Sequence, residues 1–420
     1  SKILSKTRPI GKKDSVIQYC DLGIELSLNV LIFILPFRHT ASIRSFCILF
    51  PVLLWIVKMV IKRKLLFSRT PLDLPIAAFF LWGLISLLTA TNLRYSINEI
   101  RGEMATYFLL FYLVINNLRD EEKIKDLIKT LTLGVFTMSF YGIIEFLQRE
   151  NRSLTEMVKI NSLTVDLGVY LILAVPVVFI LYGLSNSIKE KFFMSIVDLI
   201  ALFALYLTHN RAAWVAFIAQ VILLTGIKKK WKTLLAVISM VFILMVIAIF
   251  SPVKDVLIHE VPVPSPTGEM VGRETALSRI VIWKEGIGKI REHPLTGIGY
   301  GKESFKKAFP DNPIMLEDTG LWHTHNIFME IALEIGIPGL IIFLWLLYSL
   351  TKTIIKGMKT TGFRKVLMTS LLIVLIGFLI RNQFDYIYID DTALMFWLLM
   401  GMGMAMTLKG QGLGWGSLKT

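Results

Sequence analysis

The sequence predicts an all-α integral membrane protein with about twelve transmembrane helices and one large loop that contains helices. Three observations lead to this fold class: 55% of the 420 residues are hydrophobic, the mean hydropathy is +0.64, and long apolar runs recur along the chain. A helix needs roughly 20 mostly apolar residues to cross a bilayer. The runs are too long and too uniformly apolar for barrel strands. We therefore expect helices, which satisfy their own backbone hydrogen bonds in lipid.

The apolar runs give the order of the candidate helices. They cover about 22–37, 42–61, 73–91, 99–116, 124–147, 163–184, 192–208, 211–227, 232–250, 326–350, 364–384 and 391–408. Only His209 and Asn210 separate the seventh run from the eighth, which would place Arg211 at a membrane surface. The chain then divides into residues 1–250 with nine helices, residues 251–325 as an external loop, and residues 326–420 with three helices and a cytoplasmic tail.

The formal net charge of +14 arises from Lys and Arg residues that form short clusters between the apolar runs. Basic residues concentrate in the cytoplasmic connections of membrane proteins. Here the clusters fall on alternate connections from the N-terminus onward, which places both termini inside and the 251–325 loop outside. This distribution indicates that the partners of the chain are membrane lipids, and it argues against a nucleic-acid partner. Cys20 and Cys47 have neither metal-binding spacing nor a disulfide framework, and we expect them to be packing residues.

The 251–325 loop is the one connection long enough to have structure of its own. Its Pro-rich segment VPVPSPTG (261–268) is typical of extended or loop backbone. A helical pattern follows from about Thr275 to Arg291, and the apolar residues on one face are Ile280, Trp283, Ile287 and Ile290. The run HPLTGIGYG (293–301) contains a Gly-x-Gly-x-Gly pattern. Without a preceding strand, it predicts a tight turn rather than a nucleotide site.

Two arginines at the outer side could bind an anion. Arg211 lies in THNRAAW (208–214), at the mouth of a helix, where an arginine either extends to water or neutralises a negative group. Arg279 lies in GRETALSRIVIW (272–283), where the simpler alternative is a solvated surface charge.

The segment HTHNIFMEIALEIGIPGL (323–340) is the sharpest motif in the chain. A histidine there could take a proton from a hydroxyl, as a general base does, or it could belong to a helix cap. His323 and His325 are two residues apart and would face different ways on a helix. A metal shared between them is therefore disfavoured unless both lie in a loop.

The run His325-Asn326, nine residues, Gly336, two residues, Gly339 resembles the H-[NSQ]-x9-G-x-x-[GTY] signature of bacterial O-antigen ligases. The frame from Thr208 to Leu340 is similar to the O-antigen ligase and polymerase superfamily. It combines an Arg-x-x-Trp entry to a helix, an outer loop with Ser-Arg and His-Pro-Leu-Thr-Gly-x-Gly, and the His-Asn helix. The signature is fairly specific for the superfamily and less specific for ligase over polymerase.

This resemblance implies a glycosyltransferase of lipopolysaccharide biosynthesis in the bacterial inner membrane, with its active site facing the periplasm. The donor would be a polysaccharide (O-antigen) on undecaprenyl diphosphate, and the acceptor a sugar of the lipid A core. The resemblance implies that His325 is catalytic and that Arg211 and Arg279 bind the donor diphosphate. His323 is a possible supporting residue, and so is an outer acidic residue, Asp385 or alternatively Asp390.

The chemistry of these residues suits that reaction. Cleavage of a sugar–diphosphate bond leaves a charged group that two arginine forks can neutralise. A neutral histidine could deprotonate the attacking hydroxyl, and attack opposite the diphosphate would invert the anomeric carbon. We expect no cofactor and no metal, since the first outer connection (38–42) has no carboxylate and a helix cap explains Asp390 and Asp391. The alternatives are an O-antigen or exopolysaccharide polymerase with the same donor and, less favoured, a polysaccharide-lipid transporter, which would show repeats and midplane charges.

Overall fold

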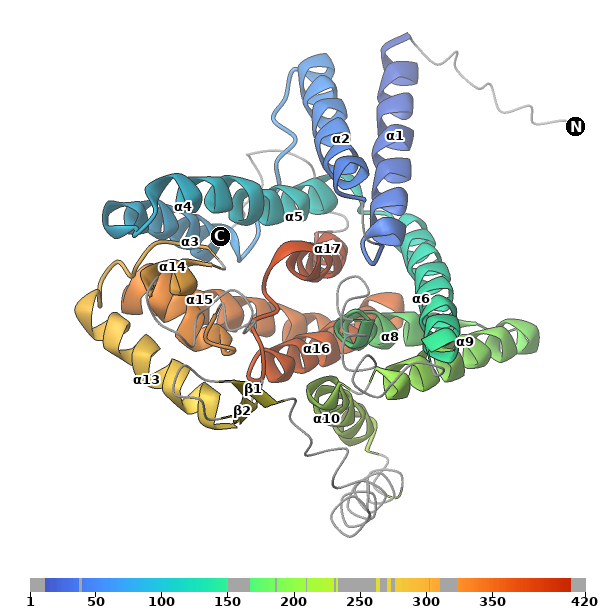
Figure 1. Ribbon diagram of the computed structural model, residues 1–420. Coiled ribbons are helices and arrows are strands. Elements are labelled where there is room, and N and C mark those ends of the chain that lie inside the picture. The colour runs from blue at the N-terminus through green and yellow to red at the C-terminus, as the bar shows by residue number, and fades with distance from the viewer. Residues whose placement is uncertain are drawn as a thin grey trace, which may run out of the picture.

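The computed structural model describes residues 12–37, 40–149, 167–185, 187–208, 210–229, 232, 262–264, 270–272, 276–301, 303–309 and 323–408. Eleven of the twelve predicted runs lie in helical segments, and the run 232–250 falls almost entirely outside the described residues. Figure 1 shows α1 and α2 projecting from a body in which α15 and α16 lie next to each other.

The first half of the chain is a series of helices joined by short turns. They are α1 (Lys12–Ile34), α2 (Ala41–Lys62), α3 (Asp73–Ile85) with the 3-10 turn η1 (Ser86–Thr89), α4 (Leu93–Glu99), the π-helical segment η2 (Ile100–Met104), α5 (Ala105–Asn117), α6 (Glu121–Arg149), α8 (Leu167–Leu184), α9 (Ile188–Leu207) and α10 (Arg211–Ile227). The helix α1 starts ten residues before its predicted span, because a polar segment with Asp14 in the first turn extends it beyond the apolar run.

The second half contains the predicted outer helix and the last three long helices. A short antiparallel hairpin, β1 (Pro262–Pro264) with β2 (Met270–Gly272), precedes α13 (Ala276–Glu292) and α14 (Ser304–Ala308). The chain continues through α15 (Ile327–Met358), α16 (Gly362–Arg381) and α17 (Asp390–Thr407). The fold is therefore helical as predicted, with this hairpin as an addition in the Pro-rich segment that the sequence assigned to extended or loop backbone.

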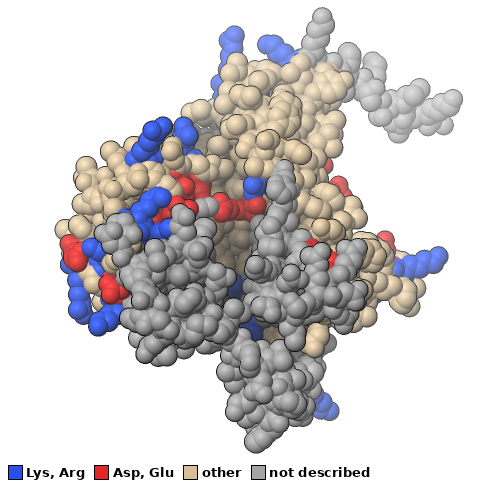
Figure 2. Space-filling view, in the orientation of Figure 1, with Lys and Arg blue, Asp and Glu red and all other residues tan. Residues whose placement is uncertain are grey.

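Within the described part of the chain, six helices, α1, α2, α6, α8, α15 and α16, are long and apolar enough to cross a membrane. The helices over 73–89 and 211–227 are apolar but shorter. Figure 2 shows that the surface over the projecting α1 and α2 is mostly uncharged, whereas acidic and basic side chains gather over the middle of the same face. These features describe a multi-pass membrane protein. The number of about twelve spans remains a prediction.

The helices that position the functional residues are fixed by buried contacts. Trp397 of α17 packs edge-to-face on Phe108 and Phe111, with ring centroids 5.1 and 5.4 Å apart, which joins the last helix to α5. Gln220 of α10 donates from Nε2 to the carbonyls of Ile172 and Ile373, at 2.8 and 3.1 Å. Because a buried amide must find partners, these two bonds fix α10, which starts at Arg211, against α8 and α16.

Candidate active site

The segment His323–Asn326 lies in the loop that enters α15. Asn326 is the N-cap of this helix: its Oδ1 accepts from the amides of Phe328 and Met329, at 3.0 and 3.1 Å. Its Nδ2 donates to Oε1 of Gln383 at 2.9 Å. The backbone of Ile327 also bonds to the connection between α16 and α17, where Asn382 supplies the carbonyl at 3.0 Å. The His-Asn motif is therefore joined to the end of α16.

His325 forms a dyad with Asp385 across this junction. Its Nδ1 lies 3.1 Å from Oδ1 of Asp385, and the residue is 5% exposed. The other carboxylate oxygen, Oδ2, accepts from Nη2 of Arg381 at 3.1 Å, one helical turn before Asp385. The backbone φ of His325 is +55°, a left-handed conformation that disfavours a side chain with Cβ by about 1–2 kcal/mol. The surrounding bonds must therefore hold it.

The charges around Asp385 decide which atom of the dyad donates its hydrogen bond and which accepts it. Burial alone would raise the pKa of the Asp385 carboxyl, but the hydrogen bond with His325 and the charge of Arg381 outweigh burial and hold that pKa well below its usual range. An ionised Asp385 accepts hydrogen bonds, so Nδ1 of His325 carries the proton and Nε2 has the free lone pair. Among the described residues, Nε2 has no hydrogen-bond partner.

His323 faces the same carboxylate, which is the case that the sequence left open for two histidines in a loop. Its Nε2 lies 3.5 Å from Oδ1 of Asp385, and its ring centroid is 4.4 Å from that of His325. The two histidines can share one side because they lie in a loop, where the left-handed residue turns the chain. Burial lowers the pKa of His323 to about 4, since its charged form loses more hydration than Asp385 restores.

These three side chains also bear on the metal question. One donor atom from each of His323, His325 and Asp385 lies within 4.8 Å of the others, a spacing that an ion could bridge. However, the second oxygen of Asp385 already pairs with Arg381, and the fixed guanidinium charge would repel a divalent cation at this distance. The arrangement therefore suits a hydrogen-bonded dyad better than a metal centre.

Thr324 connects the histidine loop to two helices. Its amide and its Oγ1 both lie 2.6 Å from Oε2 of Glu330, a fully buried carboxyl group in the first turn of α15. Its carbonyl accepts from Nε1 of Trp283 in α13 at 2.9 Å. The helix of the outer loop is thereby attached directly to the residue that precedes His325.

The outer helix α13 agrees with the predicted range to within a residue at each end, but its packed face differs in part. Ile282 is fully buried, and Trp283 and Ile290 pack beside it. Ile287, expected on this face, is 42% exposed. The face shifts because α13 packs on α15 at Gly286, where an added Cβ would meet Met329 and Thr324 at 3.4 and 3.5 Å.

The glycines of HPLTGIGYG (293–301) allow this segment to pack closely against α15. The segment forms a turn rather than a nucleotide site. Gly297 has a φ of +70°, and a Cβ there would lie 2.4 Å from the carbonyl oxygen of Leu333. On the other side, Gly336 has a φ of +76°, and its Cβ would lie 2.3 Å from the carbonyl oxygen of Leu295. The predicted helix after His325 is consequently kinked at Gly336, and the first glycine of the His-Asn signature allows this contact between two backbones.

The two predicted arginines are placed less completely. Arg211 is exposed at the first position of α10, directly after the N-cap Asn210, whose Oδ1 accepts from the amide of Ala213 at 2.9 Å. Arg279 belongs to α13, one helical turn before Trp283, but its side chain lies outside the described part of the structure. The structure therefore brings together His325, His323 and Asp385, and it places the helix of Arg279 beside them. Asp390, the alternative acid, begins α17 next to Asp391, which pairs with Arg44.

Sequence reasoning missed three residues of this arrangement: Arg381, Glu330 and Thr324. Arg381 and Asp385 are opposite charges at i and i+4, a spacing that could have indicated their pairing. Glu330 carries a weaker signal, a carboxylate on the apolar side of a helix directly after the histidine motif. Nothing in the sequence indicates that Thr324 would reach it.

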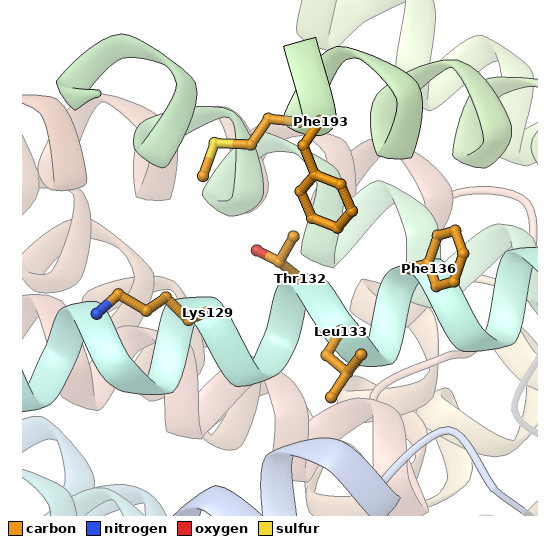
Figure 3. Close-up of a pocket in the computed structure, with 6 residues that line it drawn as sticks. Lys129, Thr132, Leu133, Phe136 and Phe193 are labelled. Carbon is orange, nitrogen blue, oxygen red and sulfur yellow. The ribbon is translucent and has the colours of Figure 1, made fainter. Parts of the chain in front are cut away.

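The cavity in Figure 3 is separate from this site, because it lies between α6 and α9. It has a volume of about 140 Å³ and is lined by Lys129, Thr132, Leu133, Phe136, Phe193 and Met194. Its walls are apolar apart from Lys129 and Thr132, and it offers no candidate for the chemistry of the histidine loop.

Comparison with known proteins agrees with the resemblance in the sequence. The O-antigen ligase family model matches residues 196–344, which include α10, α13, the histidine loop and the kinked start of α15. Candidate polysaccharide ligases of Rickettsia typhi and Rickettsia conorii are each 27% identical, over 296 and 300 residues, or 68% and 69% of this chain and 69% of each relative. A Rickettsia felis relative with the same description is 26% identical over 318 residues, 73% of this chain and 71% of its own. This membrane protein is therefore similar to the O-antigen ligase family over residues 196–344 and to these polysaccharide ligases over about two thirds of its length.

Proposed function

We propose that this protein is a glycosyltransferase that moves a polysaccharide from undecaprenyl diphosphate to a sugar of the lipid A core, at the periplasmic face of the bacterial inner membrane. One observation carries the proposal: His325 is oriented by Asp385 and Arg381 so that a single ring nitrogen, Nε2, is left to accept a proton. The matched family and the relatives described as polysaccharide ligases support a role in polysaccharide biosynthesis.

In the proposed reaction His325 is the general base. Nε2 takes the proton of the acceptor hydroxyl as its oxygen attacks the anomeric carbon of the donor. The bond between that carbon and the diphosphate oxygen breaks, and undecaprenyl diphosphate leaves with the electron pair. Attack from the face opposite the diphosphate inverts the anomeric configuration. Asp385, whose side chain is partly buried, stabilises the imidazolium that forms and retains its own negative charge, as the carboxylate of a catalytic dyad does.

Arg211 and Arg279 would neutralise the leaving diphosphate. A guanidinium group is permanently charged and offers parallel donors that match phosphate oxygens. The bond from Trp283 to Thr324 supports this role of Arg279. It keeps α13 against the histidine loop at Trp283, one helical turn away from position 279. We infer that no metal takes part, since Arg381 already supplies the positive charge beside Asp385.

The test is transfer from a purified undecaprenyl-linked glycan to purified lipid A core by the protein in nanodiscs. His325→Ala should abolish transfer and leave donor binding largely intact, because the arginines hold the diphosphate. His325→Asn is the informative control, since asparagine tolerates the left-handed backbone at this position and cannot act as a base. An active Asn variant would reduce His325 to a structural role.

Two further arms use the same assay. Wild-type transfer should survive excess EDTA, and loss of activity that Mg²⁺ or Mn²⁺ restores would show that a metal is required. Replacing the lipid A core with undecaprenyl-linked glycan as the only acceptor tests the polymerase alternative. Chain growth in that arm, with no product on the lipid A core, would contradict the ligase assignment.

A further inference from the structure

The left-handed backbone of His325 is held from both sides. On the C-terminal side, Asn326 bonds to Gln383, and the amide of Ile327 bonds to the carbonyl of Asn382. These bonds fix the start of α15 but do not reach the peptide that enters His325. The amide of that peptide donates to Nδ1 of His323 at 3.3 Å, and its carbonyl accepts from Trp283. On the N-terminal side, that peptide belongs to Thr324. The direction of the imidazole therefore depends on what holds Thr324.

Glu330 holds Thr324 through one oxygen. Its Oε2 lies 2.6 Å from the Thr324 amide and 2.6 Å from the Thr324 hydroxyl. The arrangement resembles a capping box, in which a glutamate in the first turn of a helix accepts from the backbone at the N-cap. Here the glutamate reaches further back, to the residue two positions before the cap Asn326. It therefore fixes the loop itself as well as the helix end.

The burial of Glu330 indicates that these bonds matter. The residue is fully buried, and among the described residues its second oxygen, Oε1, has no hydrogen-bond partner. A carboxylate in such surroundings is unfavourable unless its hydrogen bonds compensate. Thr324 offsets part of this cost, since both hydrogen bonds of the Glu330 side chain among the described residues lead there. An apolar residue would fill the same position without this penalty, but it could not hold the loop.

We propose that Glu330 is a positioning residue for the transfer reaction. Through Thr324 it fixes the left-handed backbone at His325, and it thereby directs Nδ1 to Asp385 and leaves Nε2 for the acceptor hydroxyl. This inference rests on the proposed function of His325 as a base. Glu330 does not touch the reacting atoms in this scheme, and its effect on catalysis passes entirely through the orientation of the imidazole.

The kinetic test compares graded substitutions in the transfer assay. Glu330→Ala removes the acceptor and should lower kcat roughly tenfold to a hundredfold, the effect of a misplaced catalytic group, while KM for the donor stays within about twofold. Glu330→Gln keeps an acceptor oxygen of the same reach and should retain kcat within about threefold. Thr324→Val keeps the amide bond and loses the hydroxyl, so its kcat should lie between those of Glu330→Ala and Glu330→Gln. Thr324→Ser should have the wild-type kcat.

A second readout needs no activity. Nitrogen NMR of ¹⁵N-histidine protein should show His325, assigned by its loss in His325→Gln, as the tautomer protonated at Nδ1. In Glu330→Ala this signal should become a mixture of tautomers, and in Glu330→Gln it should remain. Glu292→Ala is the matched control: it removes an exposed glutamate of α13, 57% exposed at the side chain, and should change neither readout.

The outcomes separate the two proposals. Wild-type kcat and a wild-type tautomer in a folded Glu330→Ala would overturn the positioning role. If Glu330→Ala does not fold, Thr324→Val decides by the same two readouts, and an unchanged kcat and tautomer there would also overturn it. If the wild type transfers no glycan, the proposed function fails, and the tautomer of His325 in the Glu330 variants still decides whether Glu330 positions the ring.

Discussion

Asp385 accepts hydrogen bonds from His325 through one carboxylate oxygen and from Arg381 through the other. Its negative charge therefore sets the tautomer of the histidine, while Arg381 keeps it ionised despite burial. The position matches one of the two outer acids that the sequence offered. Asp390, the other, starts α17 and has a Coulombic interaction with Arg44.

We expect Asp385→Asn to reduce transfer roughly a hundredfold or more, because an amide can present an N–H to Nδ1 and select the wrong tautomer. The protein should still accumulate in the membrane, since the side chain keeps its shape. The measurement is kcat for glycan transfer, with Asp390→Asn as the control. Comparable losses in both variants would remove the special role of Asp385.

The other titratable neighbour, His323, predicts a pH dependence of stability. Its pKa in the folded protein is about 4, below the ordinary value of 6.5, because burial disfavours the charged ring. The unfolded chain therefore binds a proton that the folded chain does not between these values, and stability falls as pH drops from 6.5 to 4, by about 3 kcal/mol at most. Above 6.5 both states are neutral and the contribution of His323 is constant.

This can be measured as detergent-solubilised unfolding, followed by tryptophan fluorescence, at pH 4.5 and pH 7.5. The wild type should unfold more readily at the lower pH, and His323→Gln, which cannot take up the proton, should show a smaller difference. An identical pH dependence in the variant would assign the effect to other groups.

At the scale of elements, the kink in α15 explains why the signature contains a glycine ten residues after Asn326, with nine residues between them. The backbone of the 293–301 segment crosses α15 at Gly336, where the amide of Ile337 bonds to the carbonyl of Pro294 at 2.8 Å. The amide of Ile298 likewise bonds to the carbonyl of Leu333 at 2.9 Å. The apolar period of the sequence predicted the helix here. It could not reveal the kink, because the cause is a backbone that approaches from another part of the chain.

Gly336→Ala should destabilise the protein by roughly 2 kcal/mol or more, since it combines a left-handed backbone with a Cβ placed 2.3 Å from the Leu295 carbonyl oxygen. Thermal unfolding in nanodiscs is the measurement, and limited proteolysis should show earlier cleavage near residues 293–301. Gly288→Ala is the control, because an added Cβ meets nothing within 4 Å in α13. Equal melting temperatures for Gly336→Ala and wild type would contradict the role of this contact.

At the scale of the whole molecule, α15 and α16 form an antiparallel pair that places the histidine loop and the turn at Thr360 at opposite ends. After the kink, residues Ile337 to Met358 of α15 form a continuous stretch whose length at about 1.5 Å per residue matches the hydrocarbon core of a bilayer of roughly 30 Å. The helix α16 returns to Arg381, beside Asp385. If α15 and α16 both cross the membrane, the turn at Thr360 lies on the face opposite the dyad.

Cysteine labelling in intact spheroplasts can decide which face this is. In a Cys20→Ala, Cys47→Ala background, which removes two buried native thiols, a cysteine at Glu292 should react with an impermeant reagent. A cysteine at Thr360 should react only after the membrane is opened. The reverse pattern would place the dyad in the cytoplasm and exclude the proposed periplasmic reaction.

The sequence by itself determined the membrane class, the positions of most helices and the resemblance to the O-antigen ligase family. These depend on apolar runs and on a motif of fixed spacing, and both are local properties of the chain. It also indicated His325, His323 and Asp385 as candidates for the site. Tertiary structure alone decided that these three converge, that Arg381 supports the acid, and that Glu330 holds Thr324. The carboxylate and the histidine loop of the dyad are 60 residues apart along the chain. Their distance in space depends on how α15 and α16 pack, which no local pattern encodes.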